Sequence, residues 1–203
     1  MNFTRSFPPF TLSQIKLISS KRLIILDLDN TIYPETSWLF SAYASIAAFS
    51  GVPPSCQFMI DYFLSNGRNG IFQAVRQAFP AMKGSNSEWL EIMHNQSVLL
   101  TPFPWVKKFL EDFACIRQCI VTNGNPRQQL NKYKCILSSL PTPPPKLFCC
   151  NMWAPKPASD ISQHLLHYYN LQPGDCIMIG DSLSDEEFAI NSNFDFILLT
   201  NAG

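Results

Sequence analysis

The sequence predicts an α/β protein, with a parallel sheet covered by helices on both faces and a helical block inserted after the first strand. The first observation is a series of short apolar runs bounded by turn formers, at 23–26, 119–121, 147–150, 176–179 and 196–199. The second is that helical patterns at 126–140, 157–169 and 184–191 separate the last four runs. Strands that alternate with helices are typical of βαβ units and of a parallel sheet buried on both faces.

The third observation is that the stretch 34–100 breaks this alternation. It contains four helical patterns, at 37–50, 55–66, 71–79 and 87–98. Serines at 37, 55 and 87 are candidate N-caps, and glycines at 51 and 67 are candidate helix stops. We expect 34–100 to form a small cap over the carboxyl ends of the strands, where open α/β sheets bind ligands. The core domain then comprises 23–33 and 101–203.

Composition limits the classes of partner. The chain has 203 residues, which suggests one domain or one domain with an insertion. A charged fraction of 15% with 13% aromatic residues argues against disorder. Fifteen basic and fifteen acidic side chains cancel, so no overall field draws the chain to nucleic acid or anionic lipid. We expect a small-molecule partner, no nucleic acid and no membrane; the sequence does not indicate an oligomeric state.

Cysteine usage and the N-terminus bear on location. The seven cysteines include no CxxC pair, which favours reduced thiols in a cytoplasmic protein. No apolar run reaches the length of about 18 residues that a membrane span needs, and no signal-peptide core precedes the first strand. Residues 1–22 form an N-terminal extension to which the pattern assigns no role.

Acidic residues follow two of the predicted strands. Asp27 and Asp29 come directly after the first, and their side chains project to the same side of an extended chain. Asp181 and Asp185 follow the run at 176–179. Such carboxylates repel one another unless a cation lies between them, and oxygen ligands of this kind suit Mg²⁺. The alternative is that they are ordinary turn and helix-capping residues.

Two further strand ends carry polar groups. Thr122 and Asn123 offer a hydroxyl, an amide and backbone N–H groups just before a helix, an arrangement that binds phosphate oxygens. Lys156 lies between two prolines at the start of another helix. A lone lysine there is usually on the surface, but opposite an acidic cluster it is a candidate partner that neutralises charge.

These four elements, in this order, resemble the motifs of the haloacid dehalogenase superfamily of phosphohydrolases. The first motif, hhhDxDxT, matches residues 24–31; the second and third match Thr122 and Lys156; the fourth, GDxxxD, matches 180–185. The resemblance covers 23–199 and implies a Rossmann-like three-layer α/β/α core with a helical C1-type cap.

A finer resemblance rests on two segments. Residues 27–35, and 122–126 followed by Gln128 or Gln129 and Lys132, are similar to pyrimidine 5′-nucleotidase-like enzymes. They are also similar to phosphatases found with bacterial polysaccharide biosynthesis.

The superfamily resemblance implies a mechanism. Asp27 would attack the phosphorus and form an aspartyl-phosphate, while Asp29 would protonate the leaving oxygen and later deprotonate water. Lys156, Thr122 and the N–H groups near Asn123 would stabilise the phosphoryl oxygens.

The resemblance also implies Mg²⁺ as cofactor. Its ligands would be Asp27, the main-chain carbonyl of Asp29 and Asp181, with Asp185 bound directly or through water. The implied activity is Mg²⁺-dependent hydrolysis of a small phosphorylated metabolite of the nucleotide or sugar phosphate type.

Substrate selection would fall to the cap. Arg68, in a glycine-flanked turn, is a candidate for a second anionic group of the substrate, although exposed arginines are commoner. Trp38 and Tyr43 are candidate pocket residues, although aromatic residues at helical spacing are more often core.

Other activities on the same fold stay open. They are a phosphomutase, which would return the phosphoryl group to its product, a protein phosphatase, and a catalytically silent binding module. The silent module predicts a lost motif residue, and none is lost here. Asp29 argues against the dehalogenase branch, which lacks an acid at that position.

Overall fold

The computed structural model describes residues 9–200. Within this range the chain divides into two compact units. The first unit combines 9–34 with 101–200, and the second comprises 35–100.

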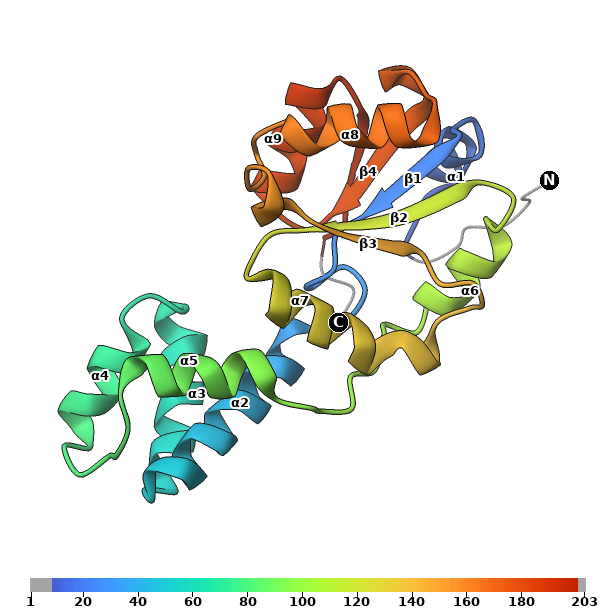
Figure 1. The fold of residues 1–203 in the computed structure, drawn as a ribbon. Coiled ribbons are helices and arrows are strands. Elements are labelled where there is room, and N and C mark those ends of the chain that lie inside the picture. Colours follow the sequence, from blue (N-terminus) through green and yellow to red (C-terminus); the bar gives the residue numbers. More distant parts are fainter. Residues whose placement is uncertain (1–8, 201–203) are drawn as a thin grey trace. The chain divides into compact units, whose positions relative to one another are not determined.

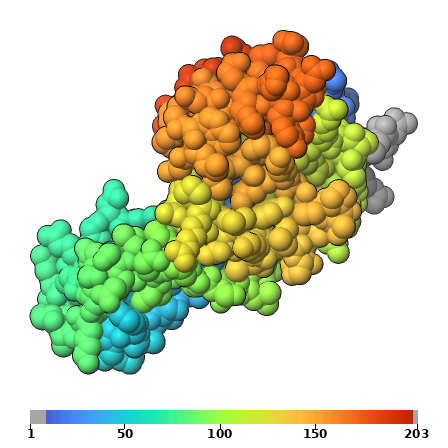
Figure 2. Space-filling view, in the orientation of Figure 1, coloured from blue at the N-terminus to red at the C-terminus, as the bar shows by residue number. Residues whose placement is uncertain are grey.

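The first unit is built on a five-stranded parallel sheet of order β3-β2-β1-β4-β5 (Figure 1). Its strands are β1 (Leu23–Leu26), β2 (Arg117–Thr122), β3 (Lys146–Cys149), β4 (Cys176–Gly180) and β5 (Asp195–Leu198). Every residue of the central strand β1 is fully buried. In the space-filling view, orange and yellow atoms of the later chain make up most of the visible surface of this unit (Figure 2). The predicted parallel α/β class is confirmed.

Helices cover both faces of the sheet. Those of the first unit are α1 (Leu12–Ser19), α6 (Val106–Asp112), α7 (Pro126–Ile136), α8 (Asp160–Tyr169) and α9 (Leu183–Ser192). Helices α8 and α9 lie on one face, with α6 and α7 on the other (Figure 1). Three 3₁₀ turns complete the unit, at Leu137–Ser139, Cys150–Met152 and Pro173–Asp175. Alternate residues of β1, β2 and β4 point into a core shared with α8 and α9, as the pleat of a strand requires.

Residues 9–22, to which the sequence assigned no role, belong to the first unit and contribute buried side chains to it. Phe10 stacks on Phe109 of α6 with 5.0 Å between ring centroids. Ile15 and Ile18 of α1 are buried, and Lys21 donates to the carbonyl of Gly174 at 2.9 Å. Residues 1–8 lie outside the described residues.

The second unit is helical. It consists of α2 (Glu35–Ser50), α3 (Pro54–Asn66), α4 (Ile71–Ala78) and α5 (Asn86–Asn95). Gly51 and Gly67 follow the ends of α2 and α3, each with φ of 73°, the left-handed geometry that favours glycine. The role of this unit as a cap stays a prediction.

The predicted N-caps of these helices were wrong, because each helix begins before the predicted serine. Helix α2 begins two residues before Ser37, and Pro53 precedes α3. Helix α5 begins after Ser85, whose hydroxyl accepts from the N–H of Glu88 while that glutamate accepts from the N–H of Ser85. This reciprocal capping box starts the helix before Ser87.

No helix in the described part of the chain is long and apolar enough to cross a membrane. All seven cysteines are free thiols, and four of them are buried.

Candidate active site

The two acidic strand ends meet at the carboxyl edge of the sheet. Strands β1 and β4 are neighbours in parallel register, with Leu26 opposite Ile179, so both strands end at the same edge. As a result Asp27, Asp181 and Asp185 each offer a carboxylate oxygen within 4.8 Å of the others. The sequence predicted these residues, and the structure brings them together.

Lys156 lies between the acids. Its Nζ donates to Asp27 Oδ1 at 2.6 Å, to the carbonyl of Val121 at 3.0 Å, and to Asp185 Oδ1. The lysine side chain is 2% exposed. A buried ammonium group with three acceptors is fully paired, which is how proteins accommodate charge in the interior.

The electrostatics of this group are those of a crowded acidic site. Burial raises the pKa of Asp27 to about 7; the ammonium group of Lys156 lowers it, and the carboxylates of Asp185 and Asp29 raise it. The pKa of Asp181 is also raised, first by burial and then by Asp185. Burial lowers the pKa of Lys156, but the two carboxylates more than offset this and raise it above its ordinary value.

The donor set fits a magnesium ion. Mg²⁺ prefers carboxylate oxygens together with water and phosphate oxygens. Burial is the main cause of the raised pKa values of Asp27 and Asp181, and repulsion by the carboxylate of Asp185, which a cation would relieve, adds to it. Asp185 also forms hydrogen bonds outside the cluster, because its Oδ2 accepts from the N–H and hydroxyl of Ser182.

Ser182 is also the N-cap of α9, and Asp185 stands three residues later in a reciprocal capping box. The alternative role as helix-capping residues therefore applies to Asp185 alongside its place in the acidic cluster. The hydroxyl of Ser184 lies 2.9 Å from that of Ser182.

Thr122 and Asn123 end β2 beside this cluster. The side chain of Asn123 forms two hydrogen bonds with the backbone of Lys156: its Nδ2 donates to the carbonyl at 2.9 Å and its Oδ1 accepts from the N–H at 2.7 Å. The Asn123 side chain thus fixes the segment that carries Lys156. Phosphate binding by Asn123 stays a prediction for its backbone N–H. Thr122 is buried, and its hydroxyl accepts from Gln129 at 3.2 Å.

Asp29 lies in a separate hydrogen-bond network that the sequence motifs did not predict. Lys132 Nζ donates to both of its carboxylate oxygens, at 2.8 and 2.7 Å. Gln129 Nε2 donates to Asp29 Oδ2 at 3.1 Å, and the hydroxyl of Tyr33 donates to Asp29 Oδ1. The segment with Gln129 and Lys132 contributed to the finer resemblance, but nothing in the sequence tied it to Asp29.

The three candidate selecting residues lie in the second unit. Arg68 forms an ion pair with the buried Glu35, although its own side chain is 59% exposed. Trp38 and Tyr43 are buried, and Tyr43 lies 6.5 Å from the ring of Phe63. Burial raises the pKa of Tyr43 to about 12, with Arg68 lowering it and Glu35 raising it. Trp38 and Tyr43 therefore have the character of core residues, and substrate contact by any of the three stays a prediction.

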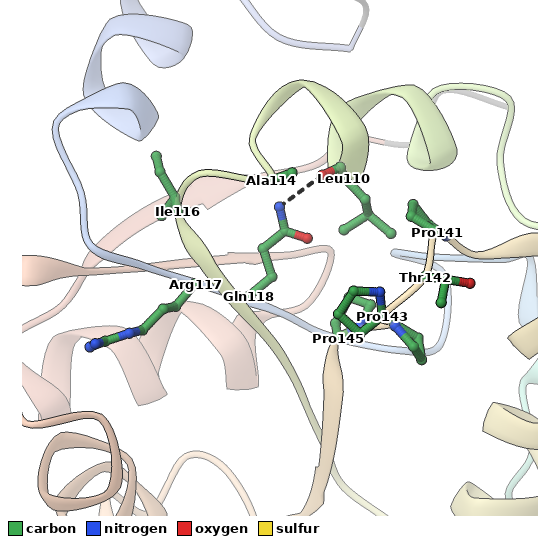
Figure 3. A pocket seen from close by; sticks show the side chains of 10 residues that line it. Leu110, Ala114, Ile116, Arg117, Gln118, Pro141, Thr142, Pro143 and Pro145 are labelled. Carbon is green, nitrogen blue, oxygen red and sulfur yellow. Dashed lines mark hydrogen bonds between the residues drawn. The ribbon is translucent and has the colours of Figure 1, made fainter.

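A cavity of about 250 Å³ lies at the opposite end of the sheet (Figure 3). It is bounded by the first residues of β2 and by the proline-rich loop 141–145, and the amide of Gln118 donates to the carbonyl of Leu110 at 3.0 Å across it. The cavity contains none of the acidic residues, so it is distinct from the candidate active site.

Comparisons with known proteins agree with this fold. A family model described as haloacid dehalogenase-like hydrolase matches residues 21–193. No curated protein matches the chain. Among solved structures, a haloacid dehalogenase-superfamily hydrolase of subfamily IA from Geobacter sulfurreducens is similar, with 16% identity, a TM-score of 0.65, and coverage of 88% of this chain and 87% of that one.

Two further structures carry ligands. A candidate hydrolase of the superfamily from Bacillus subtilis, bound to magnesium, has 14% identity, a TM-score of 0.64, and coverage of 88% and 86%. A hydrolase of the family from Deinococcus radiodurans, with bound phosphate and sodium, has 14% identity, a TM-score of 0.59, and coverage of 87% and 80%.

Proposed function

Because the chain belongs to the haloacid dehalogenase-like hydrolases, we propose that it is a Mg²⁺-dependent phosphatase of small phosphorylated metabolites. The observation that carries the proposal is the meeting of Asp27, Lys156 and the acids after β4 at one edge of the sheet. The similar structures that hold magnesium or phosphate support the same class of chemistry.

Asp27 is the proposed nucleophile. It follows β1 directly, and its N–H donates to the carbonyl of Ile179 at 3.0 Å, so its backbone is fixed by the sheet. Lys156 holds one carboxylate oxygen at 2.6 Å, which restricts the orientation of the other. A carboxylate that attacks phosphorus forms an aspartyl-phosphate, which water then hydrolyses.

The remaining groups would stabilise and orient the phosphoryl oxygens. Mg²⁺ held by Asp27, Asp181, the main-chain carbonyl of Asp29 and, directly or through water, Asp185 would supply positive charge to these oxygens when bound. Lys156 and the hydroxyl of Thr122 lie at the same edge of the sheet and would add a cation and a hydrogen-bond donor.

Asp29 supports phosphate chemistry over dehalogenation. An ester oxygen that leaves as an alkoxide needs a proton, whereas a halide does not. A second carboxyl group two residues after the nucleophile is suited to supply that proton and to take one from water afterwards.

The test is hydrolysis of 4-nitrophenyl phosphate with and without Mg²⁺, followed by a screen of nucleoside monophosphates, sugar phosphates and phosphoglycolate. We expect Asp27→Asn to abolish turnover while the circular dichroism spectrum is unchanged. Asp160→Asn, at an exposed acid of α8, is the matched control and should retain activity. Near-normal turnover by Asp27→Asn would exclude Asp27 as the nucleophile.

Two outcomes of the screen would indicate the alternatives. Turnover that requires an added bisphosphate would identify a phosphomutase. Inactivity on every substrate by a folded protein that binds Mg²⁺ would favour a silent binding module.

A further inference from the structure

The four contacts on Asp29 come from three side chains, and two of these lie on α7. Gln129 and Lys132 are three residues apart, so they share one face of the helix. Both are buried, at 3% and 2% exposed, although glutamine and lysine are usually found on the surface. A lysine buried to this degree is retained in a fold where its charge is paired, and its acceptor here is Asp29.

The site therefore contains two buried lysines, each paired with a different acid of the segment that follows β1. Lys156 contacts the proposed nucleophile Asp27, and Lys132 contacts the proposed acid–base residue Asp29. Gln129 connects the Lys132–Asp29 pair to the residues predicted to bind phosphate, because its Nε2 also donates to the hydroxyl of Thr122 at 3.2 Å and to the carbonyl of Asn123. Each acid has its own lysine, from a different element.

We propose that Lys132, assisted by Gln129, is a positioning residue that holds the Asp29 carboxyl group in place for proton transfer and stabilises the negative charge that develops there. The proposal rests on the proposed phosphatase function. It adds a second lysine to the residues that the motifs assign.

The proton transfers define what Lys132 contributes. In the first step Asp27 forms a bond to phosphorus, the bond from phosphorus to the leaving oxygen breaks, and that oxygen takes the proton of the Asp29 carboxyl group. The alcohol then leaves. In the second step water bonds to phosphorus, the bond between the Asp27 oxygen and phosphorus breaks, and Asp29 takes the proton from water, so that phosphate is released. Negative charge appears on Asp29 in the first step, 2.7 Å from the Lys132 ammonium group.

The contribution must depend on the leaving group. A nitrophenolate can leave without taking up a proton, whereas an alkoxide leaves only when it is protonated. General acid catalysis accelerates such a step by about 10²- to 10⁴-fold. Loss of Lys132 should therefore slow the first step for an alkyl phosphate far more than for an aryl phosphate. A residue with a merely structural role would slow both equally.

The experiment compares kcat/KM for 4-nitrophenyl phosphate and 4-nitrobenzyl phosphate, which differ by one methylene group. For Lys132→Met we expect kcat/KM to fall at least about tenfold more for the benzyl ester, and for Gln129→Leu a smaller change in the same direction. Lys132→Arg, which keeps the charge, should restore most of the loss. Lys134→Met, at an exposed lysine of α7, should leave both values unchanged.

The ratio of the two kcat/KM values does not depend on the fraction of protein that is folded, so a destabilised variant is still informative. An equal fall for both esters, or a fall that Lys132→Arg does not restore, overturns the role of Lys132 while leaving the phosphatase function intact. A folded, Mg²⁺-binding wild-type protein that hydrolyses neither these esters nor any phosphate of the screen refutes the proposed function, and this proposal with it.

Discussion

Replacing Lys156 with methionine should destabilise the metal-free protein strongly. Methionine has a similar length and no charge, so the variant keeps most of the packing and loses the ammonium group. That group is bonded to Asp27, Asp185 and the carbonyl of Val121, all of them buried. The variant thus leaves two buried carboxyl groups without their cation.

The magnitude follows from the contact distances. At 2.6 Å and an effective dielectric constant of 20, one Lys156–Asp27 pair corresponds to about 6 kcal/mol of Coulomb energy. Removing one partner of a buried pair costs about 3–5 kcal/mol in practice, because the group left behind takes up a proton or water. We expect the free energy of unfolding to fall by about this amount.

The loss should also grow with pH. Asp27 has a pKa of about 7, well above the ordinary value of 3.8, so in wild type the stability tied to its bound proton is complete below that ordinary value and is lost as the pH rises to about 7. Lys156 lowers this pKa, so in its absence the pKa lies higher and the loss continues above pH 7. The difference in the free energy of unfolding between wild type and variant grows by about 1.4 kcal/mol for each pH unit over which only the variant keeps the proton on Asp27.

The assay is urea denaturation with a chelator, at pH 6.5 and pH 8.5. Lys134→Met controls for loss of an exposed lysine on α7, and Lys156→Met with Asp185→Asn should recover part of the stability by removing one unpaired acid. A loss below about 1 kcal/mol, or one that shrinks from pH 6.5 to pH 8.5, would refute the reasoning about this ion pair.

Three further outcomes test other parts of the structure. Gly180→Ala should reduce turnover more than tenfold, since a Cβ there would lie 2.5 Å from Asp185 Oδ2 and displace that carboxylate; kinetics with a Mg²⁺ titration would measure it. Asp181→Asn should raise the Mg²⁺ concentration for half-maximal activity by about tenfold or more, and an unchanged value would contradict its role as a ligand. Among the seven thiols Cys115 is the exposed one, so a thiol reagent should label it first in the native protein, with mass spectrometry locating the label.

The acidic cluster could be predicted because it depends on strand ends alone. Parallel strands that are neighbours in a sheet end at one edge, so Asp27 and Asp181 had to lie close once β1 and β4 were adjacent. The same short segments also contain the carboxylates from which a metal site was predicted. This part of the site is determined by topology.

The Asp29 network could not be predicted because it depends on how α7 is rotated about its axis. Gln129 and Lys132 are about a hundred residues from Asp29, and a different rotation would place other polar residues of the helix toward the site. The helices α1 and α6 were missed for a related reason. They have eight and seven residues, and so few turns reveal a helical period only where apolar residues are spaced as regularly as in α4, which was predicted.

The rotation of α7 follows from the four residues that precede it. Asn125 accepts from the N–H groups of Arg127 and Gln128, which fixes the first turn of the helix. Gly124 has a φ of 120°, and a Cβ at this position would lie 2.8 Å from Gln129 Nε2. The glycine therefore leaves the space in which Gln129 reaches Asp29.

The same segment also supplies the hydroxyl of Thr122 and the amide of Asn123 that fixes Lys156. Residues 122–125 thus set the positions of both lysines, one through Asn123 and the other through the start of α7. A change in this loop should affect the nucleophile and the acid–base residue together, whereas a change at Lys132 or Lys156 affects one of them. The loop therefore couples the position of the proposed nucleophile to that of the proposed acid–base residue.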